Sequence, residues 1–373
     1  MKHKGNQARR IVVKVGSSSL TDERGSLDNG KMSALVSQLA QVRNQGRQVV
    51  LVTSGAIRAG MERLELNKRP KNMPELQAAA AAGHSQLMHV YTQLLAEHGI
   101  VAAQVLLTRD DFDHRRRYLD ARNTIYALLR LGCLPIVNEN DTVATDEIRF
   151  GENDTLAALV AAGVGADLLL NLSDVDGLYS GVPGSGPDCC LIEEVTEIDD
   201  EIERIAGGPS DAGGSGGMKS KIESAKIATS SGVRVVIANA SRPNVIVDVA
   251  SGEKVGTRFL SSKVGLSHRK RWIAFGSRVK GSIIINDGAR KVLVEQGKSL
   301  LSVGIAGCSG SFKVGDLVAV LDERAKEIAR GLTNYDSDAV ELIKGKRSSE
   351  IEKILGYKDY DEVIHRDNLV LGV

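Results

Sequence analysis

The chain contains few aromatic residues and few cysteines for its length. Phe, Trp and Tyr make up 3% of its 373 residues, so a large core must be built from aliphatic side chains. The four cysteines show neither C-x-x-C spacing nor a disulfide framework, which is typical of reduced, structural thiols. We therefore expect a cytoplasmic protein.

Long apolar runs and an excess of charge are also absent. No stretch approaches the ~20 consecutive apolar residues needed to span a bilayer. The first apolar run is interrupted by Lys14 and is too short for a signal peptide. The formal net charge is +1, so the whole chain offers no broad field for nucleic acid or an anionic membrane. These absences predict a soluble protein with no membrane partner.

Two common nucleotide-binding signatures are missing as well. The sequence has no Gly-x-x-x-x-Gly-Lys-Ser/Thr loop, and no Gly-x-Gly-x-x-Gly follows its first predicted strand. The seven histidines show no metal-binding spacing, and we expect them to be scattered over the surface. A phosphate site in this chain must therefore be of another type.

Up to about residue 260, short β-branched runs alternate with helical patterns. Strands are predicted at residues 11–15, 49–52, 101–107, 134–137, 168–172 and 233–237. Helices are predicted at residues 32–42, 75–97, 118–131, 155–164 and 218–231. This alternation is typical of an α/β fold with an open, mostly parallel sheet sandwiched by helices.

The pattern of apolar and polar residues changes after about residue 262. A basic, linker-like stretch is followed by short apolar runs punctuated by glycine. Since the length also favours more than one domain, we predict an α/β domain over residues 1–262, a linker over 263–272 and a small, mostly β domain over 273–373.

Lysine stands beside glycine at two distant places. Lys14 and Gly16 end the first predicted strand, and residues 213–221 lead into the helix predicted at 218–231. Glycine lets backbone N–H groups approach an anion, lysine adds positive charge, and a helix N-terminus adds free donors. Two such sites that converge would grip one polyphosphate, which makes phosphoryl transfer the first hypothesis. The alternatives are a lysine that reaches solvent and glycines that form a flexible linker.

Amides and carboxylates gather where later elements meet. Residues 138–141 read Asn-Glu-Asn-Asp after a predicted strand, and residues 152–154 read Glu-Asn-Asp before a predicted helix. Carboxylates can hold an ammonium group or, through water, Mg²⁺, and carboxamides suit a zwitterionic substrate. A helix cap would explain one such residue but not both repeats. We assign a function to Asp141, Asn153 and Asp154, and leave Glu139 and Glu152 open.

Two further strand ends carry polar groups. Residues 53–56 (Thr-Ser-Gly-Ala) could bind an anion or a substrate carboxylate, or form a simple turn. Residues 173–177 could contact a nucleotide or form a turn, and we favour the contact. Because ligands bind at the carboxyl edge of an open parallel sheet, all these groups are predicted to line one rim.

Taken in order, these motifs resemble the amino acid kinase family, and within it the members that phosphorylate glutamate. The motifs that carry the resemblance are Val-Lys14-Val-Gly-Ser, Thr-Ser54-Gly55-Ala, Asn138-Glu-Asn-Asp141, Gly-Glu-Asn153-Asp154 and Gly216-Gly217-Met218-x-x-Lys221. The resemblance covers essentially the whole chain, since residues after about 270 look like a PUA domain, an RNA-binding type of fold.

The resemblance implies a reaction and its catalytic groups. ATP would phosphorylate the γ-carboxylate of L-glutamate to γ-glutamyl phosphate, the first step of proline biosynthesis, with Mg²⁺ on the ATP phosphates and no metal assigned directly to protein ligands. Lys14 and Lys221 would neutralise the transferring phosphoryl group, and Asp154 would orient both lysines. The acceptor carboxylate is already a nucleophile, so no general base is required.

Substrate contacts and partners also follow from the resemblance. Glutamate would be held by Ser54, Gly55, Asn138, Asp141 and Asn153. ATP would be held by Lys14, Ser173, Asp174, Ser215, Gly216, Gly217, Met218, Lys219, Ser220 and Lys221. The resemblance further implies proline as a feedback inhibitor, a homo-oligomer (dimer or tetramer), and RNA as a candidate partner of the C-terminal domain.

Two other interpretations remain. A related kinase would act on N-acetylglutamate, aspartate, carbamate or uridylate, but residues 138–141 and the C-terminal domain argue for a free amino acid. An RNA-binding protein with a vestigial kinase fold is disfavoured because Lys14, Asp154 and Lys221 are all retained. Glu152 stands where the family commonly has aspartate, so its contact stays open.

Overall fold

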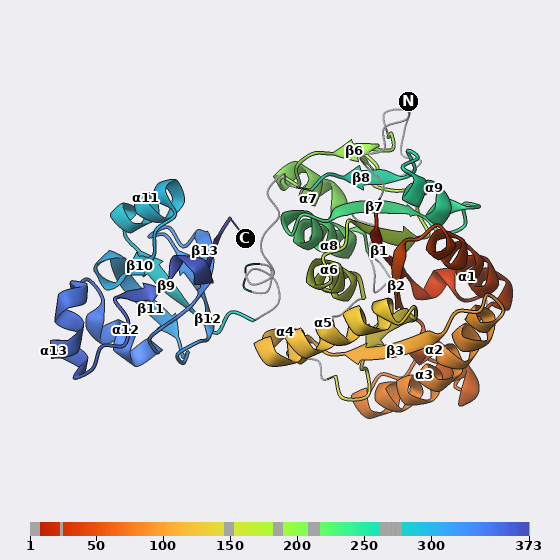
Figure 1. Ribbon diagram of the computed structural model, residues 1–373, viewed down its shortest axis with the longest axis horizontal. Helices are drawn as coiled ribbons and strands as arrows, with labels where there is room; N and C mark the ends of the chain where they lie inside the picture. The colour runs from red at the N-terminus through yellow and green to blue at the C-terminus, as the bar shows by residue number, and fades with distance from the viewer. Residues whose placement is uncertain are drawn as a thin grey trace. The chain divides into compact units, whose positions relative to one another are not determined.

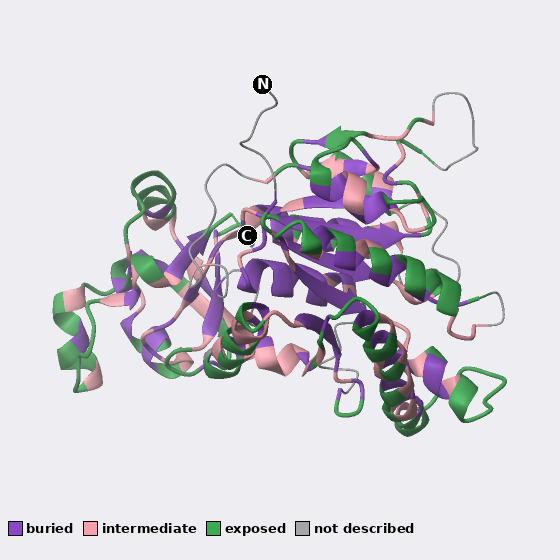
Figure 2. Cartoon of the chain, turned by 45° about the vertical axis from the view of Figure 1, so that its right-hand side comes forward, coloured by how far each residue is buried: buried purple, intermediate pink, exposed green. Residues whose placement is uncertain are grey.

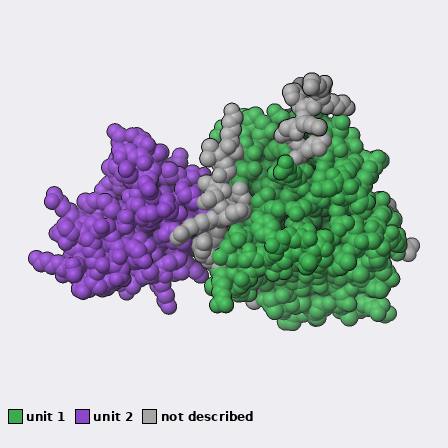
Figure 3. Space-filling model, in the orientation of Figure 1, with its two compact units in different colours: residues 1–265 green, residues 266–373 purple. Residues whose placement is uncertain are grey.

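The computed structural model (Figure 1) describes residues 8–22, 25–144, 153–181, 189–207, 217–261, 270, 273 and 278–372. The chain divides into two compact units, residues 1–265 and 266–373 (Figure 3). Among the described residues, no helix has the length and apolar character needed to cross a membrane. The predicted linker lies almost wholly outside the described residues.

An eight-stranded sheet forms the centre of the first unit, in the order β3-β4-β2-β1-β5-β7-β8-β6. Its strands are β1 (Arg10–Val15), β2 (Gln48–Thr53), β3 (Ala102–Leu107), β4 (Leu134–Glu139), β5 (Leu168–Ser173), β6 (Glu194–Val195), β7 (Arg234–Asn239) and β8 (Thr257–Phe259). Strand β8 runs antiparallel to β7, and the other described pairs of this sheet are parallel. The predicted open, mostly parallel sheet is confirmed.

Helices cover both faces of this sheet (Figure 1). They are α1 (Asn29–Asn44), α2 (Ala56–Arg63), α3 (Met73–Ala96), α4 (Arg109–Asp113), α5 (Arg115–Arg130), α6 (Asn153–Gly163), α7 (Asp200–Ala206), α8 (Met218–Ser230) and α9 (Val245–Ser251). Helices α1, α3 and α9 pack on one face, whereas α6 packs against β1 and α8 on the other. Most of the sheet is buried, and the helices expose their outer sides (Figure 2).

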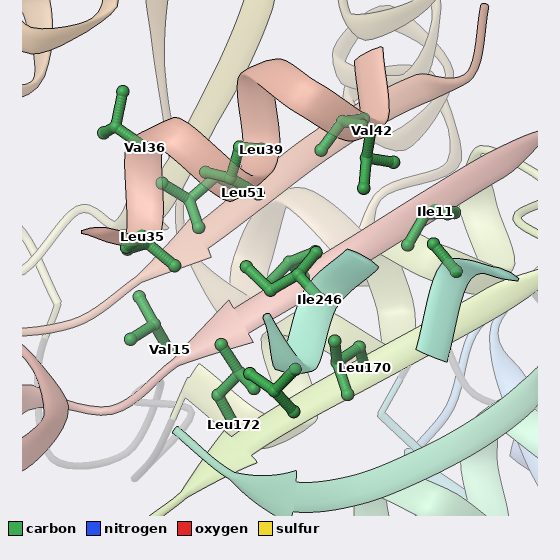
Figure 4. Close-up of a cluster of buried hydrophobic side chains, with 14 of the residues drawn as sticks. Ile11, Val15, Leu35, Val36, Leu39, Val42, Leu51, Leu170, Leu172 and Ile246 are labelled. Atoms are coloured by element: carbon green, nitrogen blue, oxygen red, sulfur yellow. The ribbon is translucent and has the colours of Figure 1, made fainter. Parts of the chain in front are cut away.

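The core of the first unit is aliphatic, as the composition predicts. Ile11, Val13 and Val15 alternate along β1 and pack with α1 and α9, as Figure 4 shows for the two outer residues of this set. Since side chains alternate along a strand, Lys14 points to the opposite face, which α6 covers. The strand geometry therefore directs this lysine toward α6.

Helices α2 and α3 touch through their backbones. A Cβ built on Gly60 would lie 1.6 Å from the carbonyl oxygen of Ala79, and one built on Gly83 would lie 1.7 Å from that of Ala56. Only glycine permits this approach at both positions. The contact fixes α3 against the helix that begins directly after Gly55.

The second unit is small and mostly β, as predicted. Its five-stranded sheet has the order β11-β9-β12-β13-β15, and β10 pairs with β14. The strands are β9 (Gly281–Ile285), β10 (Leu300–Leu301), β11 (Ile305–Gly310), β12 (Leu317–Leu321), β13 (Glu327–Leu332), β14 (Glu362–Ile364) and β15 (Leu369–Leu371). Helices α11 (Asp287–Gln296), α12 (Ser337–Ile343) and α13 (Ile351–Leu355) contribute to a separate hydrophobic core.

Candidate active site

One buried carboxylate, that of Asp154, lies between two lysines. Lys14 comes from β1, Asp154 from the first turn of α6 and Lys221 from the first turn of α8. The Nζ atom of Lys14 pairs with Oδ1 of Asp154, and Nζ of Lys221 lies 3.5 Å from Oδ2. Asp154 is 0% exposed and each lysine 6%. The two distant lysine segments thus meet at one point, which we call the lysine cluster (Lys14, Asp154 and Lys221).

Neutral donors complete the surroundings of Asp154. The side-chain amide of Asn171, on β5, donates to Oδ1 at 3.1 Å, and the hydroxyl of Ser220 lies 2.9 Å from Oδ2. The hydroxyl of Ser224 donates to the backbone carbonyl of Asp154 at 2.8 Å. Each carboxylate oxygen therefore receives one ammonium group and one neutral donor, which fixes the orientation of the carboxylate.

The electrostatics of this site keep Asp154 ionised. Burial alone would raise the pKa of Asp154, but the charges of Lys14 and Lys221 and hydrogen bonds from Lys14 and Ser220 outweigh it and lower the pKa to about 2. At neutral pH the lysine cluster then holds two ammonium groups and one carboxylate. Its excess positive charge suits an anion such as a phosphoryl group.

A second cluster begins at the neighbouring residue, Asn153. Its Nδ2 atom lies 2.6 Å from the carbonyl oxygen of Thr53, 2.7 Å from Oδ1 of Asn138 and 3.2 Å from Oγ of Ser54. Three sequence segments singled out above therefore meet here. We call Ser54, Asn138 and Asn153 the amide cluster, and it adjoins the lysine cluster because Asn153 and Asp154 are consecutive.

The amide cluster contains a buried donor with no partner. Asn138 is 3% exposed, and its Oδ1 accepts from Asn153 and from the backbone N–H of Glu139. Its Nδ2, by contrast, makes no hydrogen bond within the described part of the chain. Because a buried unsatisfied donor costs about 1–3 kcal/mol, such an atom suits a ligand oxygen.

Beside these clusters, Asp141 meets a residue that the sequence did not single out. The Nε2 atom of His84, on α3, lies 3.5 Å from Oδ2 of Asp141. The expectation that the histidines are scattered over the surface is wrong for His84, which is only 7% exposed. It is buried because it lies on the face of α3 that packs inward, together with Ala80, Leu87 and Tyr91.

The residues assigned to ATP lie at neighbouring ends of elements. Ser173 ends β5, and its hydroxyl lies 3.1 Å from Oδ1 of Asp174. Helix α8 begins at Met218 after Gly217 without a side-chain cap, so its first N–H groups can face an anion. Lys219 is exposed on the first turn of this helix. Ser215, Gly216 and Glu152 lie outside the described residues.

Comparison with known proteins identifies the family. A model of the amino acid kinase family matches residues 9–239, and a model of the PUA domain matches residues 281–355. The chain belongs to the amino acid kinase family. The resemblance indicated by the ordered motifs is thereby confirmed.

Relatives of this amino acid kinase match nearly its whole length. It is 53% identical over 362 residues to the glutamate 5-kinase of Caldanaerobacter subterraneus subsp. tengcongensis, with 97% of each chain covered. It is 50% identical over 366 residues to the glutamate 5-kinase of Moorella thermoacetica, with 98% of this chain and 97% of the other covered. A solved UMP kinase from Ureaplasma parvum has a TM-score of 0.48 at 18% identity, over 68% of this chain and 99% of the other.

The kinase site contains residues that sequence reasoning missed. Asn171 offered a signal, since it interrupts an apolar run over residues 168–172 in strand β5. Ser224 offered none, because a serine inside a helix is ordinary. Ser220 was assigned to ATP, and in this structure its hydroxyl lies 2.9 Å both from Oδ2 of Asp154 and from the backbone carbonyl oxygen of Gly217.

Proposed function

We propose that this protein transfers the γ-phosphoryl group of ATP to the γ-carboxylate of L-glutamate. The observation that carries the proposal is the lysine cluster, in which two ammonium groups share one buried carboxylate directly beside a cluster of amides. The acceptor is supported by relatives at 50–53% identity over almost the whole chain, which are named glutamate 5-kinase.

The lysine cluster would act on the phosphoryl group. Phosphoryl transfer depends mainly on positioning and on stabilising charge on the phosphoryl oxygens. Lys14 on β1 and Lys221 on α8 supply the positive charge, and Asp154 holds their side chains at fixed positions. Because both lysines are already ordered by Asp154, little reorganisation is needed when the transition state forms.

The amide cluster would bind glutamate. The unpartnered Nδ2 of Asn138 suits a carboxylate oxygen, and Ser54 and Asn153 lie within hydrogen-bonding distance of each other around it. Gly55 opens α2 with φ 101°, a conformation that favours glycine, and begins a helix whose N–H groups face the same strand edge. Asp141 supplies the negative charge for the ammonium group of the amino acid.

The N-terminus of α8 would bind the ATP phosphates. We assign Lys219, Met218 and Gly217 to this contact, together with Ser215 and Gly216, which precede them in the sequence. Ser173 and Asp174, at the end of β5, would contact the rest of the nucleotide. Mg²⁺ bound with ATP would neutralise charge on its phosphates. We place it on ATP, and assign no protein ligand to it, on the family resemblance.

Partners and location are proposed from the same family resemblance. They are proline as a feedback inhibitor, a dimer or tetramer, RNA on the PUA domain, and the cytoplasm.

The test is a panel of acceptors with Mg-ATP. ADP release is measured with L-glutamate, N-acetylglutamate, aspartate, carbamate and UMP, and acyl phosphates are trapped as hydroxamates. We expect glutamate alone to give both ADP and a hydroxamate at a high rate. An Asp154→Asn protein purified in parallel serves as the control for contaminating kinases. Preference for another acceptor, or no ATP turnover at all, overturns the proposal.

A further inference from the structure

His84 is a buried polar side chain whose Nε2 atom lacks a hydrogen-bond partner among the described residues. It is 7% exposed, and its Nε2 makes no hydrogen bond within the part of the chain that the structure describes. That atom lies 3.5 Å from Oδ2 of Asp141, close enough for an ion pair but longer than a hydrogen bond to a carboxylate. Burying an imidazole N–H without a hydrogen-bond partner costs free energy, and a bond from Nε2 to the carboxylate of Asp141 would remove that cost.

The helix that carries His84 is fixed to the amide cluster. Gly83, the residue before it, and Gly60 bring α3 into backbone contact with α2, where an added Cβ would lie less than 2 Å from a carbonyl oxygen. Helix α2 begins directly after Ser54 and Gly55. In addition, the hydroxyl of Tyr91 on α3 lies 2.9 Å from Oγ1 of Thr53. His84 therefore stands on a rigid support close to the predicted glutamate site.

Asp141, in contrast, belongs to a turn and not to a regular element. It follows β4 by two residues, and the next described turn bonds run from Val143 and Ala144 to the carbonyl of Asn140. Asp141 is 9% exposed, and an amino-acid ammonium group is bound best when the carboxylate that meets it is held in one orientation.

We propose that His84 is a positioning residue for Asp141. Its Nε2–H donates to Oδ2 of Asp141 when the substrate is bound and holds that carboxylate where it meets the substrate's ammonium group. This inference rests on the proposed function, since it takes Asp141 as the ammonium ligand. The 3.5 Å separation needs to shorten only to about 2.9 Å for this bond to form.

Three substitutions separate donation through Nε2 from simple packing. His84→Gln places an amide nitrogen where Nε2 lies, whereas His84→Asn places one where Nδ1 lies. His84→Leu keeps much of the volume and removes every donor. The apparent KM for glutamate, the KM for ATP and kcat are measured for each full-length protein by hydroxamate formation, and folding is compared by circular dichroism and melting temperature.

The expected pattern is a rise in the glutamate KM of about tenfold in His84→Leu and His84→Asn, the size of one lost hydrogen bond to a charged group. His84→Gln should stay within about threefold of wild type, and kcat and the KM for ATP should change little in all three. An equal rise in KM for the Gln and Asn variants, or a loss of kcat at constant KM, overturns the proposal. If His84→Leu does not fold, the Gln and Asn pair still decides it.

A double-mutant cycle tests whether His84 acts through Asp141. In an Asp141→Asn background, His84→Leu should raise the glutamate KM by less than about twofold, because the carboxylate it positions is gone. Additive effects overturn the proposed coupling. The wild-type protein tests the proposed function separately: without glutamate-dependent turnover that function fails, whereas normal turnover with an unchanged KM in His84→Leu refutes only the role of His84.

Discussion

Replacing Asp154 by Asn should destabilise the protein and stop its catalysis. The amide keeps the shape of the side chain but removes the charge between two buried ammonium groups. Lowering the pKa of Asp154 from its ordinary 3.8 to about 2 means that ionisation favours the folded state. At about 1.4 kcal/mol per pKa unit, this amounts to about 2–3 kcal/mol. Leaving Lys14 and Lys221 without their carboxylate raises the expected loss to about 3–5 kcal/mol.

The same reasoning predicts the pH dependence of this loss. Because the folded-state pKa of Asp154 is lowered, its contribution is complete above the unfolded value of 3.8 and disappears as the pH falls through about 2. At pH 3 roughly half of the contribution should remain. The difference in stability between wild type and Asp154→Asn should therefore be constant from pH 7 to 5 and smaller by about 1 kcal/mol at pH 3.

Urea unfolding followed by circular dichroism measures this difference, and hydroxamate formation measures kcat. We expect kcat of Asp154→Asn to fall by a factor of roughly 10² or more, as for the loss of one preorganised electrostatic group. Asp120→Asn, an exposed position on α5, is the matched control and should change stability by less than about 0.5 kcal/mol. Equal unfolding midpoints for wild type and Asp154→Asn, or a difference that does not shrink at pH 3, would refute the assigned ion pairs.

Three more outcomes follow from the same contacts. Lys14→Met and Lys221→Met should each lower kcat by roughly 10²–10³ with little change in the glutamate KM; near-normal turnover of either protein excludes that lysine from phosphoryl transfer. Asp141→Ala should raise the glutamate KM by about tenfold or more at similar kcat, and an unchanged KM removes it from the site. Gly60→Ala should lower the melting temperature by several degrees, since its Cβ would lie 1.6 Å from a carbonyl oxygen of α3. Gly207→Ala is its control, since among the described residues no atom would lie closer than 3.6 Å to the added Cβ; equal melting temperatures would contradict the helix contact.

The central layers of the first unit could be predicted because their strands are long, apolar and β-branched. Strands β6 and β8, of two and three residues, carry too little pattern to be recognised. Helix α2 was missed for a different reason. Gly60 sits in its middle, where glycine weakens a helix by about 1 kcal/mol relative to alanine. Backbone contact with α3 requires that glycine, so the tertiary structure outweighs the local preference.

The lysine cluster could be anticipated because a charge inside an apolar strand needs a partner. Lys14 pairs with Asn171 in the register of β1 and β5, so both polar side chains lie on the face that α6 covers. The sequences of β1 and β5 do not predict the strand order that places Lys14 and Asn171 side by side. Ser224 shows the limit most clearly, since its bond to the backbone of Asp154 exists only because α8 packs against α6.

The helical spacing predicts that His84 is buried, but it does not predict that its partner is Asp141. Ala80, His84, Leu87 and Tyr91 follow one another at three- and four-residue steps, which place all four on one stripe of α3. A polar residue within an apolar stripe of a helix indicates a buried contact, so this spacing favours a buried His84 over a surface one. The partner of His84 depends on the strand order. Because β4 lies next to β2, the turn after β4 brings Asp141 close to His84 on α3. Periodicity can therefore identify a buried polar residue that needs a partner, and only the strand order can say which residue it meets.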